Sequence, residues 1–277
     1  MSGSRLSHRL VFGLIASLGT GLAACGTDAG GEAAAGGASS DVGTGGALGD
    51  VGTGGAPASS DVLQWTAITL SQPAGDTSLV LGALFNDALQ KRTIILLTKL
   101  DPEGGTIEAG SGSVVEGADT AMDPTDDVFA WRTEGECVGT MGTETSPCTF
   151  NRGTAPVESV GGPDGPVQTT ESRLEINAYS TEFNMVVRLR AVGLVAERDD
   201  CAADLCASFV GAITVSDAER TIFEQTPGRA DTKTDLKTFM TNFNAMPDTE
   251  TLNDAGMMEA AYTYAGRFEA YTASFRD

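Results

Sequence analysis

The sequence contains a single histidine, His8, so residues 9–277 carry no imidazole group. This absence excludes Ser-His-Asp and Cys-His nucleophile systems, histidine-ligated zinc and imidazole acid–base chemistry from that part of the chain. The motifs Gly-x-Ser-x-Gly, Ser-x-x-Lys and His-Glu-x-x-His are missing as well. Any catalysis would therefore depend on carboxylates, lysine, tyrosine, serine or a metal held by oxygen atoms.

The chain also lacks a run of about 20 apolar residues, the length that a membrane-spanning helix needs. Its longest apolar segment, residues 10–22, is shorter than this and is interrupted by three glycines, a serine and a threonine. We therefore do not expect this segment to be a transmembrane anchor.

Arg5 and Arg9 precede this apolar segment, and the sequence Leu22-Ala23-Ala24-Cys25 lies at its end. The arrangement resembles the signal of bacterial lipoproteins and predicts a signal peptide over residues 1–24, with Cys25 acylated as the first mature residue. In the Gram-negative family, Gly26 in place of aspartate resembles cargo that is sorted to the outer membrane. We therefore expect a lipid anchor at the outer membrane, on its periplasmic or its surface face.

Residues 25–61 contain no aromatic residue, lysine or arginine and are dominated by glycine, alanine, serine and aspartate. Such a composition cannot bury enough apolar surface to offset the entropy of ordering the chain. The segment repeats the heptad Asp-Val-Gly-Thr-Gly-Gly-Ala at residues 41–47 and 50–56, and two copies are too few for a solenoid. These residues are predicted to be a disordered tether ahead of a single domain over residues 62–277.

Basic residues are scarce, with 17 Lys and Arg against 38 Asp and Glu and a net charge of −21. Loss of Arg5 and Arg9 with the signal would make the mature chain still more acidic. Nucleic acid needs clustered Lys and Arg and is excluded as a partner. The acidity indicates a solvated surface, and it would also suit cation binding.

Four cysteines besides Cys25 form two close couples, Cys137 with Cys148 and Cys201 with Cys206. In an exported protein an even number of cysteines indicates disulfides, and four cysteines allow three connectivities. We favour the two local pairs because each brackets a polar, turn-rich stretch. Zinc is the alternative, but the spacings do not match paired Cys-x-x-Cys units.

The part of the chain after the tether is predicted to be mainly β, with an antiparallel β-sandwich or barrel-like domain. Strands are expected at residues 62–70, 79–85, 93–100, 128–132, 173–179, 184–196 and 207–215, where apolar residues alternate or β-branched residues cluster. The two strands at 184–196 and 207–215 would form a long hairpin. In the first of them Val186, Arg188, Arg190 and Val192 would share one face.

Two short helices are expected near the C-terminus. Ser216 and Glu219 have capping-box spacing, which predicts a helix over residues 217–225. Leu236, Phe239, Met240 and Phe243 have helical spacing and predict the second. Residues 261–275 fit both periods, and their aromatic and threonine content favours a closing strand.

The lipobox, the tether, the β-rich domain and the segment Phe209-Val-Gly-Ala-Ile-Thr-Val-Ser-Asp217 together resemble uncharacterised lipoproteins of Gram-negative bacteria. The resemblance implies fold and location. It assigns no activity and no functional residues.

An acidic loop contains Asp248, Glu250, Asn253 and Asp254, whose oxygen atoms could converge on Ca²⁺. The loop departs from the Asp-x-Asp-x-Asp-Gly pattern, so a solvated turn is the favoured interpretation. The sequence implies no other cofactor. A second acidic cluster, Asp123, Asp126 and Asp127, has weaker spacing.

Three functional classes stay open. The leading one is a non-enzymatic binding module that takes a glycan, an envelope protein or an ion. A carboxylate-driven glycan hydrolase needs two acids about 5–10 Å apart, and glycan sites usually present aromatic side chains. Trp65 and Trp131 lie in apolar strand patterns and are predicted to be core residues. A purely structural envelope component is the third class.

Overall fold

The computed structural model describes residues 62–101, 104–117, 127–138, 145–159, 166–170, 173–197, 201–224 and 233–276. In chain order the elements are β1 (Val62–Gln72), α2 (Asp76–Gln90), β2 (Leu96–Asp101), β3 (Thr106–Glu116), β4 (Val128–Trp131), β5 (Glu134–Val138), β6 (Thr145–Thr149), β7 (Gly153–Ser159), β8 (Val167–Thr169), β9 (Leu174–Ser180), β10 (Met185–Glu197), β11 (Leu205–Thr214), α3 (Val215–Arg220), β12 (Ile222–Glu224), β13 (Lys233–Asp235), α4 (Leu236–Asn242), β14 (Thr249–Leu252) and β15 (Met258–Phe275). Strands dominate, which confirms the predicted mainly β class.

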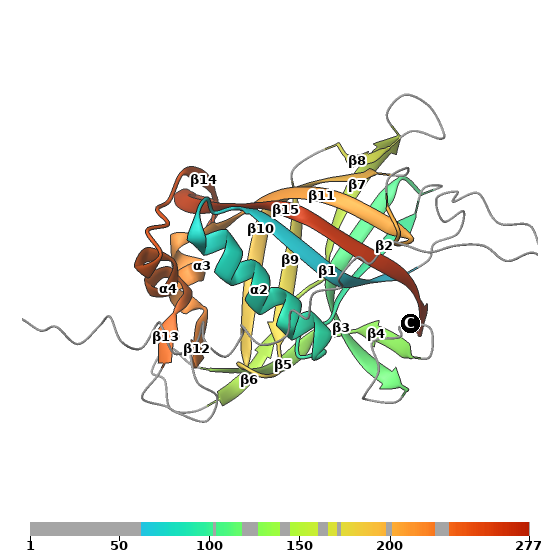
Figure 1. The fold of residues 1–277 in the computed structure, drawn as a ribbon, viewed down its shortest axis with the longest axis horizontal. Helices are drawn as coiled ribbons and strands as arrows, with labels where there is room; N and C mark the ends of the chain where they lie inside the picture. The colour runs from blue at the N-terminus through green and yellow to red at the C-terminus, as the bar shows by residue number, and fades with distance from the viewer. Residues whose placement is uncertain are drawn as a thin grey trace, which may run out of the picture. The chain divides into compact units, whose positions relative to one another are not determined.

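Eight strands form a ring in which every neighbouring pair is antiparallel, in the order β1, β2, β3, β7, β8, β10, β11 and β15. The ring closes because β15 also pairs with β1, from Val62 opposite Ala273 to Gln72 opposite Ala265. Ring order follows chain order, so each strand lies beside the ring strand that precedes it (Figure 1). The barrel-like architecture predicted from the strand pattern is confirmed.

Side chains from alternate positions of the ring strands fill the interior, as expected for eight strands that close on themselves. Trp65 stacks on Phe268 with ring centroids 3.7 Å apart, and Phe209 lies within 6.4 Å of both rings. The indole Nε1 of Trp65 donates a 2.8 Å hydrogen bond to Thr98 Oγ1 and so has a partner although it is buried. The prediction that Trp65 belongs to the core is confirmed.

Trp131 belongs to a second apolar cluster, separate from the ring interior. Here Val62 and Leu97 point away from the interior and are covered by Phe129 of β4. β4 reaches them by pairing with β3 and, in parallel, with the last residues of β15. Trp131 is half-buried and makes an edge contact with Phe275, so it packs in this smaller cluster.

β15 is the longest strand, with 18 residues, and it pairs with β14, β11, β1 and β4 in turn. Tyr262, Tyr264 and Phe268 of this strand all point into the core, which fits the two-residue period of a strand. The prediction of a closing strand is confirmed. At Gly266 a Cβ atom would lie 2.3 Å from Thr69 O, so glycine is needed for the close approach of β1.

The predicted strand at residues 79–85 is wrong, because this segment lies within the helix α2. Leu81, Ala88 and Leu89 share one helical face and are buried in the main core. The side-chain amide of Asn86, in the same helix, pairs with the backbone of Ile68 in β1 as a neighbouring strand would. Its Nδ2 donates to Ile68 O at 2.6 Å, and its Oδ1 accepts from Ile68 N at 2.9 Å. β1 pairs with β2 only at its first three residues, Val62 to Gln64, and α2 runs along the part of β1 that follows them (Figure 1).

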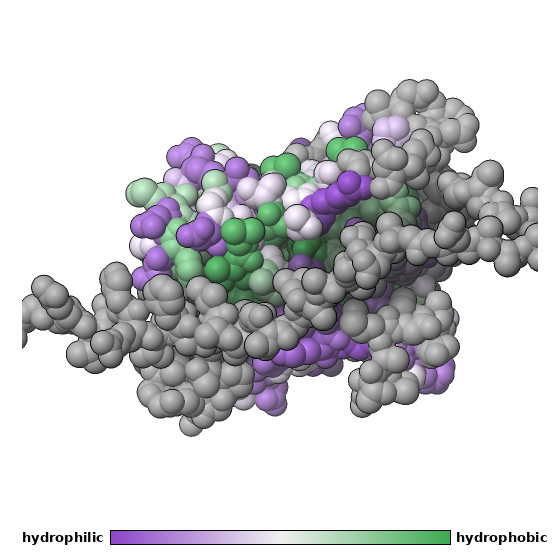
Figure 2. All heavy atoms as spheres, viewed as in Figure 1, coloured by the Kyte–Doolittle hydropathy of each residue, from purple (hydrophilic) through white to green (hydrophobic). Residues whose placement is uncertain are grey.

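α2 also presents apolar atoms to solvent. Figure 2 shows hydrophobic residues over this helix, and Leu79 is 71% exposed. The helix is therefore apolar on more than its buried face, which explains why its sequence resembles that of a strand.

A bulge in β10 changes the predicted alternation of its side chains. Ala191 has a positive φ of 50°, and the register with β9 and with β11 shifts at this point. Because the extra residue inverts the period, Val192 joins Val187 in the core, whereas the prediction placed them on opposite faces. Arg188 and Arg190 keep the face opposite Val187, so both guanidinium groups point away from the apolar interior.

The helix near residue 217 begins and ends earlier than predicted. α3 has Thr214 as its N-cap, and the hydroxyl of Thr214 accepts a hydrogen bond from Asp217 N. Ser216 is not the cap because its N and Oγ both donate to the carboxylate of Glu259. The second predicted helix is confirmed as α4, which Asp235 caps at Thr238 N.

Candidate functional site

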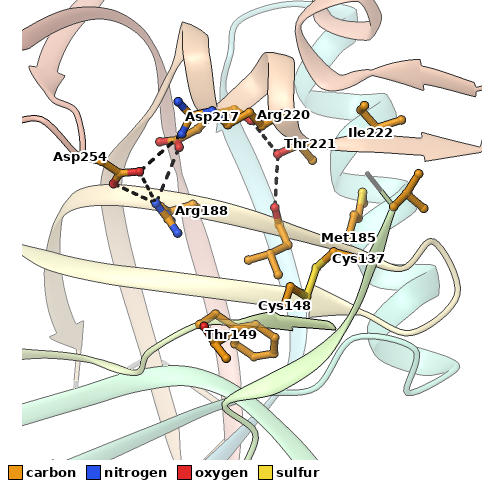
Figure 3. A pocket seen from close by; sticks show the side chains of 13 residues that line it. Cys137, Cys148, Thr149, Met185, Arg188, Asp217, Arg220, Thr221, Ile222 and Asp254 are labelled. Atoms are coloured by element: carbon orange, nitrogen blue, oxygen red, sulfur yellow. Dashed lines mark hydrogen bonds and ion pairs between the residues drawn. A yellow bond between two sulfur atoms is a disulfide. The ribbon is translucent and has the colours of Figure 1, made fainter. Parts of the chain in front are cut away.

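A cavity of about 210 Å³ opens between the β5–β6 hairpin and the segment that joins α3 to β12 (Figure 3). The first residues of β10 form its floor. Its lining contains Cys137, Val138, Cys148, Thr149 and Phe150 from the hairpin, Met185, Val186 and Arg188 from β10, Asp217, Arg220, Thr221 and Ile222 from the α3 region, and Asp254 from the β14–β15 turn.

The hairpin wall is fixed by a disulfide and by hydrogen bonds to the barrel. Cys137 and Cys148 are joined with a Cα–Cα distance of 5.7 Å. The phenol of Tyr179 donates to Glu136 O and accepts from Glu136 N, each at 3.1 Å. These contacts tie the hairpin to β9, so this wall is held in one position.

One end of the cavity adjoins an ion-pair cluster of Arg188, Arg190, Asp217 and Asp254, and Arg190 is the one of these four that does not line the cavity. Glu175 and Arg220 join the cluster at longer distances of 3.4 to 3.7 Å. Arg190 donates from Nε and Nη2 to the two carboxylate oxygens of Asp217, and from Nη2 to Asp254 Oδ1 at 2.6 Å. Arg188 Nη1 donates to both oxygens of Asp254 at 2.9 and 3.1 Å. The cluster joins β10, α3 and the β14–β15 turn, which lie far apart in the sequence.

Arg190 and Asp217 are the buried members of the cluster, with 8% and 5% of their surface exposed. Burial disfavours the charge on Arg190, but hydrogen bonds to Asp217 and Asp254 outweigh this effect and raise the pKa of Arg190. The hydrogen bond from Arg190 likewise lowers the pKa of Asp254, helped by the charge of Arg188. Both shifts favour the charged forms of Arg190 and Asp254.

The four residues predicted as possible calcium ligands make other contacts in the structure or are exposed. Asp248 Oδ1 accepts from Thr263 N at 2.8 Å, and Asn253 Oδ1 accepts from two backbone amides of its own turn. Asp254 forms ion pairs with Arg188 and Arg190, while Glu250 is exposed on β14. Across the described ranges no group of three or more His, Cys, Asp or Glu side chains could hold a metal ion.

Asp127 of the second acidic cluster is a buried ion-pair partner. Only 2% of its surface is exposed, and one of its carboxylate oxygens lies 2.5 Å from Arg92 Nη1. Asp123 and Asp126 lie outside the described residues. Cys25, the predicted signal peptide and the predicted tether also lie outside them.

Both predicted disulfides are confirmed. Cys201 and Cys206 are joined at a Cα–Cα distance of 5.9 Å and close the turn between β10 and β11. Only Cys137–Cys148 contributes to the cavity.

The sequence did not predict that Arg188, Arg190, Asp217 and Arg220 belong to one site. The one available signal was a pair of arginines two positions apart in a predicted strand, in a chain with far fewer basic than acidic residues. The acidic partners could not be found from spacing, because Asp217 and Asp254 are 27 and 64 residues from Arg190.

No protein-family model matches the chain, and no curated protein and no solved structure matches it. Among the helices of the described residues, none is long and apolar enough to cross a bilayer.

Proposed function

We propose that the protein is an outer-membrane lipoprotein that acts as a non-enzymatic binding module of the cell envelope. The lipobox that ends in Cys25 supports the lipid anchor. Two disulfides suit an oxidising compartment such as the periplasm or the cell surface.

The observation that carries the binding function is the cavity with its two fixed walls. Aromatic and aliphatic side chains occupy the interior of the ring, so we place the binding site at the cavity. The Cys137–Cys148 bridge fixes one wall, and the ion-pair cluster fixes the other through Asp217. A site whose walls are already ordered has little conformational entropy to lose on binding.

The glycan hydrolase alternative receives no support from the carboxylates at the cavity. Asp217 and Asp254 both line it, but both are paired with arginines. A general acid needs a raised pKa, whereas the pKa of Asp254 is lowered. The large hydrophobic side chains exposed within the described ranges are aliphatic or methionine, so they offer no aromatic platform for a sugar ring.

Site-specific photo-cross-linking in intact cells tests the binding function. A benzoylphenylalanine at Thr149, in the cavity wall, should give a discrete cross-linked species. The same residue at Thr69, which is exposed on β1 and does not line the cavity, is the matched control. No adduct from Thr149, or the same adducts from both positions, would contradict the proposal.

A further inference from the structure

We propose that the cavity binds the C-terminal residue of an extended polypeptide, with the carboxylate at Arg220 and the apolar side chain against Met185 and Ile222. This inference rests on the proposed function of the cavity and adds the chemical class of its ligand.

Arg220 supplies the positive charge. Its side chain is 62% exposed, and its Nη1 lies 3.5 Å from Asp254 Oδ2, which is at the limit of a hydrogen bond. A guanidinium has five N–H donors arranged to meet a carboxylate with two parallel hydrogen bonds. Arg220 can therefore turn toward an incoming carboxylate at little cost.

The acidic residues of the lining have shorter contacts to other arginines than to Arg220. Asp217 is paired with Arg190, and Asp254 is shared by Arg188 and Arg190 at distances of 2.6 to 2.9 Å. Arg220 adds a cation beside carboxylates that already have partners. Counted with Glu175, which pairs with Arg188 and Arg190, the cluster has three arginines and three carboxylates, so it is close to neutral in a chain with a net charge of −21.

The other end of the cavity is apolar. Met185 and Ile222 line it together with the Cys137–Cys148 disulfide (Figure 3), and Val138 is a further apolar residue of the cavity lining. Methionine is flexible and adapts to side chains of different shape. This end therefore suits an aliphatic side chain such as leucine.

The small volume of the cavity favours a single terminal residue of a polypeptide over a whole small molecule as the ligand. Sites for whole small molecules usually enclose about 300–1,000 Å³, and this cavity measures about 210 Å³. A C-terminal residue carries its carboxylate and its side chain on the same Cα, so one residue can satisfy both ends of a small site. The rest of the polypeptide continues into solvent.

The test uses the full chain purified in detergent and two peptides of equal length, acetyl-Gly-Gly-Leu with a free carboxylate and the same peptide as its carboxamide. Isothermal titration calorimetry should show about tenfold tighter binding of the carboxylate, because a charge-assisted pair replaces a neutral contact. Acetyl-Gly-Gly-Gly should bind several-fold more weakly than acetyl-Gly-Gly-Leu because it lacks the apolar side chain.

Two variants complete the test. Arg220→Gln should remove the preference for the carboxylate, whereas Arg276→Gln, at an exposed arginine paired with Glu116, should keep it. Equal binding of acid and amide, an unchanged preference in Arg220→Gln, or no binding of any peptide would overturn the inference. The cross-link at Thr149 reports separately on whether the cavity is a binding site, so failure of the ligand class is distinguishable from failure of the proposed function.

Discussion

The ion pair between Arg190 and Asp217 is the most consequential contact at the residue scale. Two charges are removed from water here, and each is compensated by the other. In addition, Arg190 donates a hydrogen bond to Asp254, and Asp217 accepts one from the hydroxyl of Thr214. The pair joins β10 to α3 and so positions one wall of the cavity.

Arg190→Ala should therefore strongly destabilise the fold. The substitution leaves the Asp217 carboxylate buried without its main partner, which typically costs about 3–5 kcal/mol of unfolding free energy. Urea denaturation followed by circular dichroism measures the loss. Arg276→Gln is the matched control, since exposed pairs contribute about 0–1 kcal/mol; similar losses in both variants would contradict the role of the buried pair.

The lowered pKa of Asp254 predicts a pH dependence of stability. A carboxyl group whose pKa is lower in the folded than in the unfolded state stabilises the fold above the unfolded value of about 4 and loses this contribution as pH falls through the folded value. Asp254→Asn should therefore be less stable than wild type at pH 7, and the difference should shrink below pH 4. Urea titrations between pH 7 and pH 2.5 measure it, and a difference independent of pH would argue against the ion pair.

At the scale of elements, the two disulfides have different roles although they have similar chemistry. Cys137→Ala/Cys148→Ala and Cys201→Ala/Cys206→Ala should each lower the unfolding free energy by about 2–3 kcal/mol, because both bridges close short loops. The first pair forms a cavity wall, so its removal should also weaken binding of acetyl-Gly-Gly-Leu.

The Cys201–Cys206 variant should bind the peptide as wild type does, which makes it the matched control for the Cys137–Cys148 variant. Calorimetry on both variants measures the difference. Equal weakening in both would show that the hairpin bridge has no specific effect on the cavity.

The elements that sequence reasoning predicted well are those whose two faces differ in polarity. In the closing strand β15 the core residues Tyr262, Tyr264, Phe268 and Ala270 lie on one face, and in α4 the buried Leu236, Phe239 and Met240 have helical spacing. α2 was missed because Leu79 is apolar yet exposed, which blurs the helical period. The bulge at Ala191 was missed because an alanine with positive φ has no sequence signature.

The candidate site could not be predicted for a different reason. Asp254 was identified as one residue of an acidic turn, but its partners Arg188 and Arg190 lie on β10, 66 and 64 residues away in the sequence. The pairing of Cys137 with Cys148 was predictable from proximity alone. Long-range convergence of charges requires the strand register, which spacing in the sequence does not contain.

At the scale of the whole molecule, the strands of the barrel follow one another around the ring in the order in which they occur in the chain. Each ring strand pairs with its predecessor in the ring, and β15 then pairs with both β11 and β1. The acidic side chains stay largely at the surface, while Trp65 and Phe268 lie at the centre. A lipid at Cys25, joined through residues 26–61, would place this barrel at the surface of a membrane.

The lipid anchor is the central claim, and the mass of the mature N-terminus tests it most directly. The protein is expressed in a Gram-negative host, and its outer-membrane fraction is analysed by mass spectrometry beside that of Cys25→Ser. The account predicts a wild-type chain that begins at Cys25 and carries acyl groups, and a Cys25→Ser chain that is absent from the outer membrane. A wild-type N-terminus without acyl groups, or recovery of Cys25→Ser in the same membrane fraction, would contradict the account.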